Sequence, residues 1–100
     1  MKLMWTASFT VDTGGVLIRK SKDTADGAIP SDIDVAAIYV EPVSESDIIE
    51  ISGIKEGCAW LPQKAGRGYL LERIMDDDHK FMLVRAPSGT VAVHLHVEGS

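Results

Sequence analysis

The chain has 100 residues, close to the commonest size of a single domain, and its 45% hydrophobic and 25% charged residues are typical of a soluble globular protein. Fifteen acidic residues against ten basic ones give a net charge of −5, so we expect no nucleic-acid partner, although an acidic face could attract a basic protein. No apolar run reaches the roughly 20 residues of a membrane span, so we expect no membrane partner. The only cysteine is Cys58, which rules out an intrachain disulfide and favours the cytoplasm.

The most regular pattern lies between Lys2 and Asp12, where apolar residues at positions 3, 5, 7, 9 and 11 alternate with polar ones, Met4 excepted. This period of two indicates a half-buried strand with Trp5 and Phe9 in the core. A short loop with Gly14 and Gly15 follows, and residues 16–20 resume a β-type sequence. The pattern predicts an N-terminal hairpin.

A polar, aperiodic stretch, SKDTADGAIPS, runs from Ser21 to Ser31. Such a composition buries too little apolar surface to offset the entropy lost on ordering. We therefore predict a long mobile loop at residues 21–31.

Three segments fit more than one element. Residues 33–40 (IDVAAIYV) resemble a capped helix at their start, but their strand-forming residues favour a strand. Residues 44–53 fit a strand or a short helix equally well. Residues 69–76 fit a strand, or a short helix because their apolar residues also match helical spacing.

The last third of the chain carries apolar runs at 69–75, 81–86 and 90–97, with turn-forming residues between them. These runs predict a three-stranded antiparallel meander. Residues 55–68 are rich in glycine and predict irregular chain that crosses the core at 58–61.

Together the patterns predict a mainly β fold, with α+β as the alternative. We expect a small single domain over residues 1–98, with an antiparallel sheet arranged as a roll or open barrel and one or two short helices possible. The terminal Gly99-Ser100 pair resembles a remnant of cloning and is left out of the domain. Few charges guard the strand at Val91–Val97, so edge pairing into a homodimer is one predicted outcome.

The C-terminal run VAVHLHVE places His94, His96 and Glu98 on one face of a strand. Neutral imidazole suits zinc, copper, nickel and iron, so these residues could bind a transition metal, with His79 or the Asp76–Asp78 run nearby in sequence. The alternation of a half-exposed strand also explains them with no ligand at all. We favour this polar face and expect no cofactor.

Other motifs carry weaker predictions. The Asp76–Asp78 run lacks the spacing of a calcium loop and indicates a solvated turn. Backbone N–H groups in Lys64–Gly68 could receive an anion, although a surface turn is the simpler interpretation. Cys58 lies in an apolar stretch, where a thiol is inert. The six aromatic residues are spread along the strands, which is typical of a core.

Two classes of function follow. We favour a non-catalytic protein-interaction or regulatory module that acts through an acidic face or an edge strand, because no catalytic constellation can be named. The alternative is a small enzyme or ligand-binding protein that uses His94, His96 and His79 beside an aromatic pocket lined by Trp5 or Trp60. A concave pocket beside the histidines would separate the two.

Overall fold

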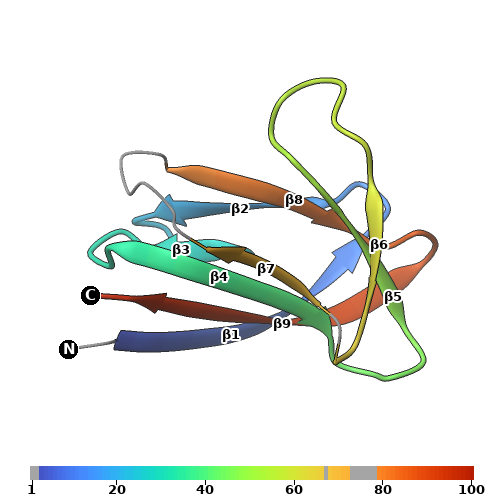
Figure 1. Ribbon diagram of the computed structural model, residues 1–100, viewed down its shortest axis with the longest axis horizontal. Helices are drawn as coiled ribbons and strands as arrows, with labels where there is room; N and C mark the ends of the chain where they lie inside the picture. Colours follow the sequence, from blue (N-terminus) through green and yellow to red (C-terminus); the bar gives the residue numbers. More distant parts are fainter. Residues whose placement is uncertain (1–2, 67, 73–78) are drawn as a thin grey trace.

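The computed structural model describes residues 3–66, 68–72 and 79–100 of the chain, which form strands and turns without a helix (Figure 1). The strands in chain order are β1 (Leu3–Asp12), β2 (Val16–Ser21), β3 (Ala28–Pro30), β4 (Val35–Pro42), β5 (Ile48–Ser52), β6 (Leu61–Lys64), β7 (Tyr69–Glu72), β8 (Lys80–Arg85) and β9 (Thr90–Gly99). The mainly β prediction is confirmed, and each of the three ambiguous segments contributes a strand. The Asp76–Asp78 run lies outside the described residues. In the described ranges, no helix has the length and hydropathy to cross a bilayer.

The strands form two open sheets that share one core. Sheet A has the order β1-β9-β4-β7, and sheet B has the order β3-β2-β8-β5-β6. The β2–β3 pair is parallel, and the other strand pairs are antiparallel. The domain is therefore a small sandwich of two open sheets, in keeping with the expected open β architecture.

The predicted pairing of neighbouring strands is wrong at both ends of the chain. β1 and β2 lie in different sheets, and β1 pairs instead with β9 from Leu3↔Gly99 to Asp12↔Thr90. The turn after β1 carries the chain across the sandwich: the carbonyl of Asp12 accepts hydrogen bonds from the amides of Gly15 and Ala86. At the C-terminus, β7 and β9 belong to sheet A and β8 to sheet B, so they form no meander. Period-two alternation predicts which face of a strand is buried. Strands of both sheets have the same period, so alternation does not show which sheet a strand belongs to.

The position of β9 also overturns the predicted dimer edge. β9 pairs with β1 along its whole length and with β4 from Val93 to Gly99, so residues 93–97 have a partner strand on both sides. Gly99 belongs to β9, and Ser100 exchanges two backbone hydrogen bonds with Asp34, at 2.9 and 3.0 Å. These two residues are thus part of the folded domain.

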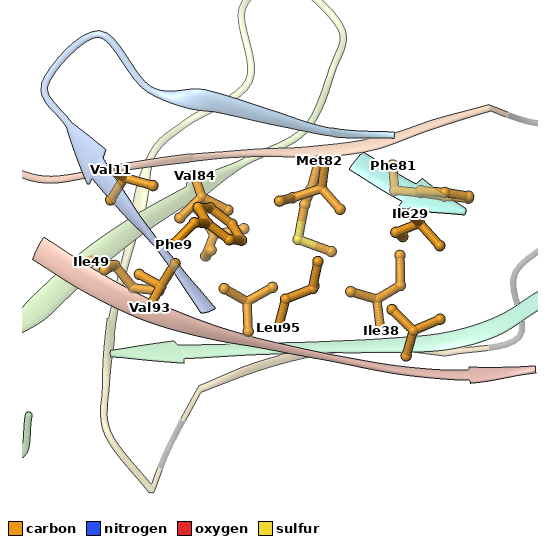
Figure 2. Close-up of a cluster of buried hydrophobic side chains, with 14 of the residues drawn as sticks. Phe9, Val11, Ile29, Ile38, Ile49, Phe81, Met82, Val84, Val93 and Leu95 are labelled. Carbon is orange, nitrogen blue, oxygen red and sulfur yellow. The ribbon is translucent and has the colours of Figure 1, made fainter. Parts of the chain in front are cut away.

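The core is built from the inward faces of both sheets (Figure 2). Its fully buried side chains, with relative exposure under 2%, are Val11, Ile18, Ile29, Val35, Ile38, Val40, Ile49, Met82, Val84, Ala86, Val93, Leu95 and Val97. Burying one such side chain stabilises a fold by about 1.5–3 kcal/mol. A bulge enlarges the core: pairing passes from Ile18↔Met82 to Arg19↔Lys80, so Phe81 is the extra residue. Phe81 and Met82 are consequently both buried.

The segment predicted as a long mobile loop contains a strand. β3 occupies residues 28–30 and pairs in parallel with β2, and Ile29 is 0% exposed. The close packing of the chain before β3 against β2 depends on Gly27. Its φ is +79°, and a Cβ there would stand 2.6 Å from a methyl carbon of Val16. The mostly polar composition of residues 21–31 did not reveal that Ala28 and Ile29 are buried in the core. The prediction of mobility remains for residues 22–26.

The described part of the glycine-rich stretch, residues 55–66 and 68, does not cross the core. Cys58 and Ala59 are exposed, so the expected apolar burial of the thiol is wrong. Trp60 is half-buried on the outside of sheet B, with the guanidinium of Arg85 3.9 Å from its ring centroid. The same Arg85 forms a 2.8 Å ion pair with Glu50, so these contacts hold the stretch against the sheet.

Candidate functional site

The predicted histidines lie on the outer face of sheet A, which is the side turned away from the core. Every second residue of each strand points to this outer face, and the register of the strands aligns these residues across the sheet. These residues are Met4, Thr6, Ser8 and Thr10 of β1, Ala92, His94, His96 and Glu98 of β9, Ala37, Tyr39 and Glu41 of β4, and Leu70 and Glu72 of β7.

The two imidazoles are half-buried and lie side by side. Their ring centroids are 6.1 Å apart, with an angle of 74° between the planes. A hydrogen bond of 2.9 Å joins Nδ1 of His94 to Oγ of Ser8 on the neighbouring strand. The ring of His96 meets Tyr39 edge-on, with centroids 5.8 Å apart. Each ring therefore has a defined neighbour on a different strand.

The carboxylate beside the histidine pair is Glu41, which the sequence did not indicate. Glu41 stands directly opposite His94 in the β4–β9 register. It shares a shallow hollow of about 610 Å³ with both histidines and with residues 6–8 of β1. Glu41 is distant in sequence from VAVHLHVE, so only strand pairing could have revealed it.

Glu98 occupies the next hollow along the sheet. That hollow measures about 190 Å³ and is lined by Met4, Ala37, Tyr39, Leu70, Glu72, His96 and Glu98. In the described residues, no three His, Cys, Asp or Glu side chains are grouped closely enough to hold a metal ion. The structure thus joins His94 and His96 but does not assemble them with Glu98 into a three-ligand set.

The residues of the alternative ligand site are dispersed. His79 precedes β8 of sheet B, where its carbonyl accepts a 2.8 Å hydrogen bond from the amide of Lys20. Trp60 also lies on sheet B, and Trp5 faces a groove on the inner side of β1. The hollow beside the histidines is lined by Thr6, Ala7, Ser8, Glu41, His94 and His96, without a tryptophan. The predicted aromatic pocket is therefore not formed around the histidines.

The glycine amides that were predicted to bind an anion bind a carboxylate of the protein itself, that of Glu41. Oε2 of Glu41 accepts a hydrogen bond from the amide of Gly66 at 2.9 Å and another from the hydroxyl of Tyr39 at 3.2 Å. The amide of Gly68 donates to the same hydroxyl at 3.0 Å. A Cβ at Gly68 would collide with the carbonyl oxygen of Val40, so only glycine fits this approach. The loop consequently fixes the orientation of the Glu41 carboxylate.

A second candidate surface is the free edge of β1, the outermost strand of sheet A in dark blue in Figure 1. The other strands at sheet ends, among the described residues, are short and carry proline or charge: β3 has three residues with Pro30, β6 has four with Pro62 and Lys64, and β7 has four with Glu72. β1 has ten residues in an unbroken register, with no proline and no charge before Asp12. Proteins ordinarily shield such an edge, because its unpaired backbone groups can recruit another strand.

A groove of about 540 Å³ runs beside this edge. One wall is formed by residues of β1, including Trp5 and Phe9, and the other by residues 21–28 and Pro30. The second wall carries two aspartates, Asp23 and Asp26, and one lysine, Lys22. The free edge of β1 is thus accessible along its inner side.

Comparison with known proteins provides no relative: no protein-family model, no curated protein and no solved structure matches the chain.

Proposed function

We propose that this protein is a non-catalytic interaction module that associates through the free edge of β1, with a second copy of the chain as its partner. The observation that supports the proposal is the contrast between this long, regular, uncharged edge and the short, proline- or charge-bearing edges of β3, β6 and β7.

Strand addition uses backbone groups that are already in place. Along the free side of a strand, every second residue presents its N–H and C=O away from its existing partner. A second strand satisfies these groups and requires little rearrangement, because β1 is held in one unbroken register with β9. The free energy of association then comes from the new hydrogen bonds and from cross-strand side-chain pairs.

A second copy of the chain meets the requirements of this edge. Each protomer carries a net charge of −5, but residues 3–11 are uncharged, so the paired strands themselves bring no like charges together. A two-fold axis beside Ala7 would set Met4 of each copy opposite Thr10 of the other in an antiparallel pair. The contact would be isologous and closed, leaving only shielded edges at the ends of the combined sheet.

The test is sedimentation velocity over a concentration series with Met4→Lys/Thr10→Lys. Both side chains are exposed on the outer face, so the fold should persist, but each new ammonium would face another across the paired edges. We expect a dimer for the wild type and a monomer for this variant. The matched control is Ser46→Lys/Ser88→Lys, which adds the same charge at exposed turns and should remain dimeric.

Two results would overturn the proposal. One is a wild-type chain that stays monomeric throughout the concentration series. The other is a variant that dimerises as well as the wild type, because the self-association would then use another surface. Circular dichroism of both variants shows that a change in mass is not a loss of fold.

A further inference from the structure

We infer that Trp5 anchors the self-association, with the indole of each chain seated in the groove beside β1 of the other chain. The inference rests on the proposed pairing of the β1 edges, and it names the side chain that selects the partner. Backbone hydrogen bonds along an edge accept almost any extended strand, whereas a groove accepts only side chains of matching size and chemistry. The indole therefore favours a second copy of this chain over an unrelated strand.

The inner face of β1 is incompletely covered at one end. Phe9 and Val11, with exposures of 8% and 0%, lie in the core, but Trp5 and Ala7 are only partly buried. Trp5 packs against the margin of the core and also lines the groove of about 540 Å³ beside the free edge. A large aromatic side chain that one chain covers only in part, next to an unpaired strand edge, is typical of an interface anchor.

The register of the paired edges brings the indole to the groove of the other chain. The two-fold axis beside Ala7 that sets Met4 opposite Thr10 also sets Trp5 opposite Phe9 of the partner subunit. Trp5 and Phe9 lie on the inner face of β1, since residues four apart on a strand share a face. Phe9 lines the groove, so the opposed indole enters the groove at this residue. Aromatic pairs directly opposite each other on neighbouring strands stabilise their pairing.

The groove suits an indole in size and in chemistry. Its volume of about 540 Å³ lies within the range of small-molecule sites, about 300–1,000 Å³, which hold groups larger than an indole. Ala7 and Phe9 give one wall an apolar surface, while Asp23, Thr24 and Asp26 bring oxygen atoms to the other. The indole is apolar except for its Nε1–H, which requires an acceptor when it is buried. The two walls offer both kinds of contact.

The other tryptophan of the chain has a different environment. Trp60 lies on the outside of sheet B, where the guanidinium of Arg85 stands 3.9 Å from its ring centroid. β1 belongs to sheet A, so pairing of the β1 edges leaves Trp60 outside the interface. Trp60 is therefore the internal control for Trp5.

The first experiment locates the indole in the wild-type dimer. Isotope-labelled and unlabelled chains are mixed at a concentration at which sedimentation velocity shows a dimer, and filtered NOEs between the chains are recorded. We expect NOEs from the indole of Trp5 to Phe9 of the partner subunit and to the groove wall at residues 23–26, and none from Trp60. NOEs between the two β1 strands with none from Trp5 would overturn the anchor while leaving the edge pairing intact.

The second experiment measures how much the indole contributes to association. Trp5→Leu removes the indole but keeps an apolar residue on the strand, and we expect the Kd of the dimer to rise roughly 30-fold or more. Trp60→Leu is the matched control and should dimerise with the Kd of the wild type. Circular dichroism checks the fold of both variants. If Trp5→Leu does not fold, the NOEs of the wild-type dimer decide.

The outcomes separate this inference from the proposal on which it rests. A monomeric wild type, or a dimer that persists in Met4→Lys/Thr10→Lys, would overturn both. A dimer that is lost in the lysine variant but keeps the wild-type Kd in a folded Trp5→Leu would overturn the anchor alone.

Discussion

β1 and β3 end their respective sheets and form the two walls of one groove, yet they depend on different features of the chain. β1 has ten residues whose alternation is visible in the sequence, and it pairs with β9 along its whole length. β3 has three residues in a polar segment, and it depends on the burial of Ile29 and on the close approach at Gly27. A long strand can thus be specified by a repeated pattern, whereas a short one can be specified by a single buried side chain and one glycine.

The largest expected effect lies within β1. Phe9 is 8% exposed and belongs to the core, so Phe9→Ala should lower the free energy of unfolding by about 3–5 kcal/mol. Trp5 is only half-buried beside the groove, and Trp5→Ala should cost clearly less. Denaturant unfolding of the two variants measures the difference. Equal losses would show that the groove end of β1 is as well packed as its centre.

A slightly smaller effect is expected for β3. Ile29→Ala should lower the free energy of unfolding by about 2–5 kcal/mol, because the side chain is 0% exposed within the core. The same measurement applies, with Thr24→Ala on the exposed part of the groove wall as control. A loss near that of the control would mean that β3 contributes little to the core.

The close approach of β3 has a test of its own. Gly27→Ala should destabilise by about 1–3 kcal/mol, since it combines a φ of +79° with the contact to Val16. Gly89→Ala is the matched control: its φ is +59°, but a Cβ there would meet no atom within 4 Å. The control should therefore cost less. If both variants lose the same stability, backbone conformation alone explains the effect.

The two walls of the groove should also differ in mobility, which can be measured on the wild-type protein. Limited proteolysis should cut first within residues 22–26, which are exposed and lie outside a strand, and should spare β1 and β9. An early cut within residues 28–30 would show that β3 opens together with the loop before it.

The smallest expected effect concerns the edge of β1. In the monomeric state, Met4→Lys/Thr10→Lys should change the free energy of unfolding by no more than about 0.5 kcal/mol, because both positions are exposed. Chemical denaturation at a concentration below that of association measures it. A larger loss would mean that the outer side of β1 contributes to folding, and the association test would then need milder substitutions.

The candidate sites were only partly predictable. VAVHLHVE placed His94 and His96 on one face of a strand, and the structure agrees, because alternation is a local property of extended chain. Ser8 and Glu41 come from other strands, so neither could be assigned to the histidines before the register was known. The prediction for residues 58–61 was wrong. Their apolar side chains suggested burial, but Cys58 is exposed and Trp60 packs on Arg85 at the outside of sheet B.

The sequence by itself determined the β class and the inward faces of β1 and β9, because period two is imposed by the geometry of each strand alone. Only the tertiary structure decided which strands are neighbours. The turns at 13–15 and 87–89 satisfy hairpin chemistry, but here they join strands of opposite sheets. A turn constrains a few residues, whereas the choice of sheet depends on burying many side chains at once. In the described residues, this collective burial places β9 between β1 and β4 and leaves β1 at the end of its sheet.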